Sequence, residues 1–167
     1  MPPQLVARRV LTWAVPLAAS LILAATGEAA TLTRSESSLL TAMNAVRAAH
    51  GLRPLRFDAR LEGAARRHSR AMLRTGVFAH GAFTARIRRV GVRTPRVGEN
   101  LAWVENGAAS PTPSSVARLI VNLWLESPAH RANLLRPGYR LLGVAAPNGP
   151  FAGHPSVQMV TADFAGY

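Results

Sequence analysis

Histidine and carboxylate side chains are the groups of this sequence that could do chemistry. The chain has five histidines, eight acidic residues and no cysteine. A histidine titrates near neutral pH, so it can act as an acid or a base, and its neutral ring can bind a divalent metal. A nearby carboxylate can complete such a site or orient the ring through its second nitrogen. Which histidines could act in this way depends on where the chain places them.

Local sequence patterns place four of the histidines. His68 lies on the apolar stripe of a predicted helix, which is more typical of a hydrogen-bonded core residue than of a ligand. His80 comes just after the end of that helix, in a predicted loop over residues 77–84. His50 lies beside a helix end and His154 lies in a loop, and we expect both at the surface.

Ser127 precedes His130 by three residues and could therefore be considered as a nucleophile. However, Ser127 is followed by Pro128, a pair typical of a helix N-cap with proline in the first helical position. Such a cap directs its hydroxyl toward backbone N–H groups. We therefore predict a capping role for this serine.

Helical periodicity dominates the first two thirds of the chain. Thr33 to Glu36 match a capping box, and apolar residues recur at helical spacing until Gly51, which predicts a helix over 35–50. A second helix is predicted from the cap at Asp58 to Gly76. Further helices are predicted over 86–90, over 116–124 after a turn-rich segment, and from residue 127.

Two apolar runs near the C-terminus predict the sheet. Residues 141–146 and 157–164 are separated by a Pro-Asn-Gly-Pro segment and are expected to be neighbouring strands joined by a long loop. Helices first and strands last indicate an α+β domain, in which helices surround a small, largely antiparallel sheet.

The first thirty residues are typical of an export signal. Arg8 and Arg9 precede an apolar stretch over residues 10–25, and small residues between Gly27 and Ala30 suit cleavage. An uncleaved anchor is the alternative, and in both cases the remainder would lie outside the cytoplasm. We expect this remainder to be one domain and a monomer, with stability from packing because there are no disulfides.

The charge of the chain is strongly positive. All twenty basic residues are arginines, and residues 31–167 carry eighteen of them against seven acids, a net charge of +11. Such a charge favours an acidic envelope surface as partner, either anionic lipid or an acidic wall polymer. Export and the absence of interleaved aromatic residues argue against nucleic acid. A generally solvated basic surface is the alternative interpretation.

Several segments together resemble the bacterial branch of the CAP superfamily, which contains cysteine-rich secretory, antigen 5 and pathogenesis-related proteins and whose domain is also called SCP. The most specific are Gly98-Glu99-Asn100 and the run from Ser127 to Asn133. The resemblance covers about residues 36–165, with the signal peptide at 1–30 outside it. It implies an α-β-α sandwich, in which helices cover both faces of a three- or four-stranded antiparallel sheet beside a broad cleft.

The resemblance also implies three cleft residues. His80 matches the first cleft histidine of the family, Glu99 the glutamate of the Gly-Glu-Asn motif, and His130 the second histidine. The second glutamate of the family falls on Ser127, and Glu126 is about 100° away around a helix, so the role is not transferred to it.

His80 and His130 are therefore the candidate metal ligands, with Glu99 beside them, and Zn²⁺ is the expected ion. The alternative is that the three residues only hydrogen-bond one another and brace the cleft. The resulting prediction is a secreted module that binds a lipid, glycan or peptide and is more a binder than an enzyme. The alternative function is a secreted, peptidase-like hydrolase that depends on metal or on the His/Glu pair.

Overall fold

The computed structural model describes residues 31–107 and 111–167, so the predicted export signal lies outside the described residues. At the centre is a sheet of five strands in which the order β1-β3-β5-β2 is joined by β4 on β5. Its strands are β1 (Arg56–Phe57), β2 (Val97–Glu105), β3 (Tyr139–Ala145), β4 (Asn148–Phe151) and β5 (His154–Gly166). All pairings are antiparallel except β1 with β3, which is parallel. The sheet thus has more strands than the three or four expected, and it is not wholly antiparallel.

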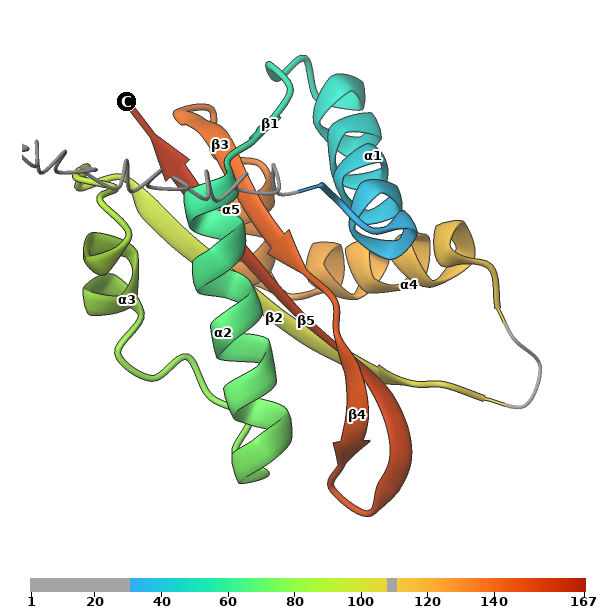
Figure 1. The fold of residues 1–167 in the computed structure, drawn as a ribbon. Helices are drawn as coiled ribbons and strands as arrows, with labels where there is room; N and C mark the ends of the chain where they lie inside the picture. The colour runs from blue at the N-terminus through green and yellow to red at the C-terminus, as the bar shows by residue number, and fades with distance from the viewer. Residues whose placement is uncertain (1–30, 108–110) are drawn as a thin grey trace, which may run out of the picture.

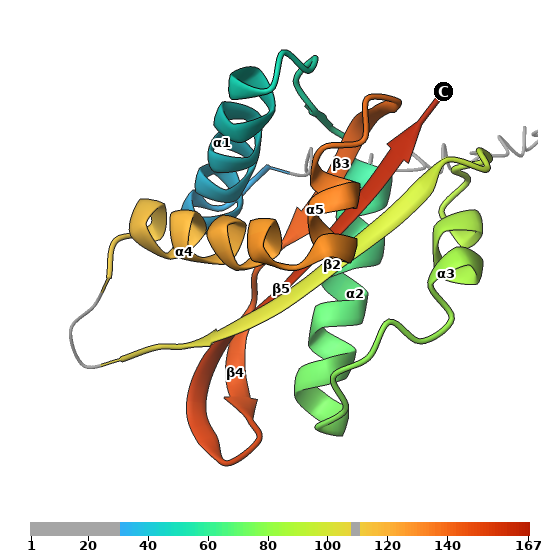
Figure 2. The ribbon, with the colours of Figure 1, turned by 180° about the vertical axis from the view of Figure 1, so that it is seen from behind.

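Helices cover both faces of this sheet, as predicted. The helices are α1 (Arg34–Ala49), α2 (Ala59–Thr75), α3 (Phe83–Arg89), α4 (Pro113–Glu126) and α5 (Pro128–Leu134). Figure 1 shows α2 and α3 in front of the sheet, and Figure 2 shows α4 and α5 in front of the opposite face, with α1 beside them. The α-β-α sandwich is thus confirmed.

The helix boundaries follow from local capping. Thr33 and Glu36 form the predicted capping box at the start of α1. The Asp58 side chain accepts hydrogen bonds from the first turn of α2, and Gly76 ends that helix in the left-handed conformation with φ of 69°. By contrast, α3 starts at Phe83, three residues earlier than predicted. No side chain caps this helix, so no sequence signal marks where it begins.

Two apolar layers hold the sandwich together. One lies between the sheet and α1 and α4 and contains Trp124, whose indole nitrogen donates to the Leu101 carbonyl at 2.9 Å. The other lies beneath α2 and α3. There Gly143 of β3 lets α2 approach closely, because a Cβ on this residue would overlap the backbone of Leu61.

The fully buried Arg47 links α1 to the chain segments around it. Its guanidinium donates only to backbone carbonyls, those of Arg53, Leu134, Arg136 and Tyr139. These hydrogen bonds replace those that the guanidinium would make to water, and so offset the cost of burying its charge. Burial also lowers the pKa of Arg47, because it disfavours the charged form. Arg47 therefore has a structural role.

Candidate functional site

The buried carboxylate of Glu99 is the centre of the site. Glu99 lies on the edge strand β2, and its side chain points toward the layer of α2 and α3. It accepts a hydrogen bond from His80 Nδ1 at 2.7 Å and another from the guanidinium of Arg86 on α3. The side chain of Glu99 is only 1 % exposed, so these charged and polar partners replace its lost hydration.

His80 is held by Glu99 but open to solvent. Its side chain is 55 % exposed, in the loop between α2 and α3. Because Nδ1 carries the hydrogen that binds Glu99, the lone pair of a neutral ring is on Nε2. The Arg86 guanidinium also donates to the His80 backbone carbonyl at 3.3 Å, which fixes the loop. The site therefore presents one oriented imidazole nitrogen.

His68 and Arg86 also belong to this cluster. His68 Nε2 donates to the Ala79 carbonyl at 2.9 Å and lies 3.9 Å from Glu99 Oε2. Burial, with the positive charge of Arg86, lowers the pKa of His68. The predicted hydrogen-bonded role of His68 is confirmed. No sequence signal marks Arg86 as a site residue, because only the fold brings α3 against β2.

Asp163 is a second buried carboxyl beside Glu99. The two residues are cross-strand partners in the pairing of β2 with β5, and Asp163 is fully buried. Within the described part of the chain, neither of its carboxyl oxygens has a hydrogen-bond partner. Burial, followed by the negative charge of Glu99, raises the pKa of Asp163 well above its usual range. Asp163 carries no sequence signal of this role, because strand register alone brings it to Glu99.

His130 approaches from the other face of β2. It lies on α5, where its backbone carbonyl accepts a hydrogen bond from Asn100 at 3.0 Å. Asn133 donates to Asn100 and to the Glu99 carbonyl, so both asparagines brace α5 against β2. Burial and then the charge of His80 lower the pKa of His130, which favours the neutral ring at neutral pH.

A metal at this site would have few protein ligands. Within the described residues, no group of three or more histidine, cysteine, aspartate or glutamate side chains is arranged to hold an ion. Glu99 is engaged by His80 and Arg86, so the candidate donors are the imidazoles of His80 and His130, between which the described residues show no direct contact. Their chemistry fits a loosely held, open-coordinated divalent ion and does not fit a closed structural zinc site.

The residues around the site differ in part from the sequence predictions. Ser127 does occupy the N-cap position of α5, but its side chain makes no capping hydrogen bond, so that part of the prediction is wrong. Glu126 is exposed at the end of α4. Trp103 packs on Phe151 and on His154, whose ring also contacts Glu105 at 3.1 Å, so His154 has partners that the sequence did not reveal.

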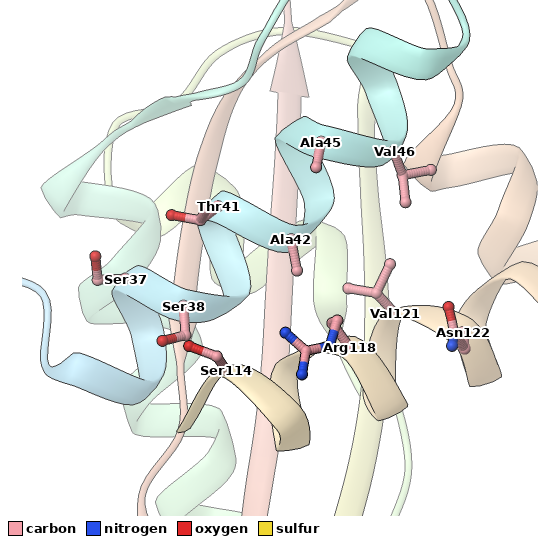
Figure 3. A pocket seen from close by; sticks show the side chains of 10 residues that line it. All are labelled: Ser37, Ser38, Thr41, Ala42, Ala45, Val46, Ser114, Arg118, Val121 and Asn122. Carbon is pink, nitrogen blue, oxygen red and sulfur yellow. The ribbon is translucent and has the colours of Figure 1, made fainter. Parts of the chain in front are cut away.

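A separate groove of about 440 Å³ lies between α1 and α4, on the other side of the sheet from Glu99. Figure 3 shows small apolar side chains such as Ala42 and Val121 between the two helices, with hydroxyl groups of Ser38 and Ser114 at one end. Arg118 is its only charged lining residue, so the groove offers a surface for binding and no acid–base pair.

Comparison with known proteins gives the family. Residues 40–161 match the model of the CAP family, the cysteine-rich secretory protein family. This chain belongs to the CAP family. It is 31% identical over 114 residues to YkwD and 33% identical over 119 residues to YlbC, both of Bacillus subtilis and both uncharacterized, the second named a membrane protein. The matches cover 65% and 67% of this chain but only 41% and 31% of those relatives.

Solved structures show the same fold. An extracellular SCP-domain protein of Bacillus anthracis superposes with a TM-score of 0.59 at 25% identity, over 83% of this chain and 45% of that one. An outer surface protein of Borrelia burgdorferi gives 0.57 at 16% identity, over 83% of this chain and 97% of that one. In the described ranges of the present protein, no helix is long and apolar enough to cross a membrane.

Proposed function

We propose that this domain is an extracytoplasmic binding module whose ligand is taken at the site of His80, Glu99 and His130, with a divalent cation held by the two histidines. The observation that carries the proposal is the exposed His80 ring fixed through Nδ1 by a buried glutamate. Carboxylate–histidine pairs of this kind orient metal-binding imidazoles and raise their basicity. The extracellular and outer-surface descriptions of structural relatives support the location.

Calorimetric titration with Zn²⁺ at neutral pH tests this proposal. The wild-type protein should bind one ion, and the melting temperature should rise with the metal concentration. Glu99→Gln should weaken Zn²⁺ binding by about tenfold or more, because the amide can still orient the His80 ring but lacks the negative charge of the carboxylate. The double variant His80→Ala, His130→Ala should lose both the binding heat and the melting shift.

The matched control is His50→Gln, because His50 is an exposed histidine at the end of α1. It should bind Zn²⁺ as the wild type does. If the wild type gives neither heat nor a melting shift at saturating Zn²⁺, or if the double variant binds equally, the trio is a structural brace and the metal proposal fails.

A second binding proposal rests on the groove between α1 and α4. Its volume of about 440 Å³ and its small apolar lining suit a slender apolar ligand such as a fatty acyl chain. A fluorescent fatty acid should bind to the wild type and be excluded by Ala42→Phe, which fills the groove. Equal binding by this variant would place the lipid elsewhere.

Hydrolysis is the remaining alternative from the sequence. In the described part of the chain, the side chains of His50, His68, His80 and His154 contact carbonyls or carboxylates, and none donates to or accepts from a serine or threonine hydroxyl. We therefore place binding first. Peptide turnover by the wild type that disappears in folded Glu99→Gln would replace the binding proposal with a hydrolase.

A further inference from the structure

The fold separates the charges of the chain. Four of the seven acids in residues 31–167 are buried, namely Glu36, Glu62, Glu99 and Asp163. Asp58 is paired with Arg60, which leaves Glu105 and Glu126 as the exposed acids of the described residues. Of the eighteen arginines in that region, fourteen are exposed. On the surface, arginines therefore outnumber acids by a larger factor than they do in the sequence as a whole.

One layer of the sandwich collects most of this charge. We define the arginine face as the exposed arginines of α2, of α3 and of the loop that follows α3. They are Arg60, Arg67, Arg70, Arg74, Arg88, Arg89, Arg93 and Arg96. Figure 1 shows α2 and α3 side by side on this layer. The acids of these segments, Asp58 and Glu62, are paired with Arg60 and Arg66, so no exposed acid interrupts the face.

The helix geometry makes α2 a straight track of positive charge. At about 100° per residue, Arg67, Arg70 and Arg74 lie within about 60° of one another, opposite the side that packs on the sheet. From Arg60 to Arg74 the rise is about 21 Å. None of Arg67, Arg70 and Arg74 forms an ion pair within the described residues. These guanidinium groups are available to an external anion.

A hollow at the end of the same layer adds a concave contact. It has a volume of about 570 Å³ and is lined by Arg88, Arg93, Thr94 and Pro95. Two guanidinium groups beside a hydroxyl suit a tetrahedral oxyanion, because arginine presents forked donors that match phosphate. The track and the hollow together offer repeated phosphate contacts.

We propose that the arginine face binds a linear phosphate-bearing polymer of the cell envelope, independently of the site of His80 and Glu99. A polymer fits better than a bilayer because the exposed apolar residues of this layer, Val77 and Phe78, lie beyond the C-terminal end of α2 and not among the arginines. Peripheral membrane helices instead combine basic and apolar faces. Multivalent contact along the track would give affinity and a strong salt dependence.

The test is titration with long-chain inorganic polyphosphate at several salt concentrations. The triple variant Arg67→Gln, Arg70→Gln, Arg74→Gln should bind at least about tenfold more weakly, and its slope of log affinity against log salt should be shallower by about 2. The control is Arg34→Gln, Arg118→Gln, Arg131→Gln, which removes the same charge from exposed positions of the other layer. It should retain binding. The melting temperatures should be unchanged in both.

Three outcomes would overturn the proposal. Absence of polyphosphate binding by the wild type at physiological salt would exclude the site. Equal loss in both triple variants would show that net charge, and not this face, attracts the polymer. Tighter binding to phosphatidylglycerol vesicles than to polyphosphate, lost in Val77→Ser, Phe78→Ser, would identify a membrane-docking surface instead. Polyglutamate, as a carboxylate polymer, should bind more weakly than polyphosphate.

Discussion

Replacing Asp163 by asparagine should change how stability depends on pH. Asp163 is fully buried beside Glu99, and burial together with the charge of Glu99 raises its pKa. Between the pKa of the unfolded chain, about 4, and the raised pKa in the folded protein, the folded state holds one proton that the unfolded state has lost. The wild-type free energy of unfolding should therefore fall as pH rises through this window.

The size of the effect follows from one proton. Its contribution to the slope is at most about 1.4 kcal/mol per pH unit. The introduced asparagine side chain would be neutral at all pH values, so Asp163→Asn should match the wild type most closely near pH 4 and gain relative stability as pH rises. The difference should level off once the pH exceeds the raised pKa.

Urea denaturation of both proteins from pH 4 to pH 8 measures this difference. Titration of the histidines cancels in the comparison to the extent that the substitution leaves their pKa values unchanged. Glu126→Gln is the matched control, because it removes an exposed carboxylate and should leave the slope unaltered. A stability difference that does not vary with pH, or one that turns against the variant as pH rises, would refute the assignment of a proton to the Asp163–Glu99 pair.

Other substitutions test the packing and the remaining polar contacts. Gly143→Ala should destabilise the protein by about 3 kcal/mol or more, because the new methyl group would force α2 away from β3, as thermal unfolding would show. Arg47→Ala should cost about 3 kcal/mol or more in urea denaturation by leaving buried carbonyls unpaired. Burial lowers the pKa of His68 in the folded protein. The neutral ring therefore contributes its full stabilisation above the unfolded pKa of about 6.5, and this stabilisation is lost as the pH falls through the lower pKa of the folded state. His68→Asn should flatten the dependence of the unfolding free energy on pH in this range.

Much of the helical architecture could be predicted because its signals are local. The capping box at Thr33 and the pair of Asp58 and Gly76 each act within one turn of helix, so neighbouring residues are sufficient to reveal them. The strand β2 was not predicted, although it contains the Gly-Glu-Asn motif. Five of its consecutive residues are buried, so it lacks the alternation of an exposed strand, and polar residues interrupt its apolar pattern.

The candidate site was only partly visible in the sequence. The resemblance to the family named His80 and Glu99, and the structure brings these two side chains into contact. Arg86 and Asp163 carry no motif, and they join the site through the packing of α3 and the register of β5. The metal role of His80 and His130 stays a prediction that titration must decide.

By itself the sequence determined the ends of α1 and α2, the apolar stripes and the net charge of +11 on residues 31–167, because composition and short-range hydrogen bonding need no partner from elsewhere in the chain. Only the tertiary structure decided where those charges go. Burial of a carboxylate requires partners or a proton from distant segments, as for Glu99 and Asp163. Arginines that find no such partner must stay in water, and the packing of α2 and α3 on the sheet places eight of the fourteen exposed arginines in one layer.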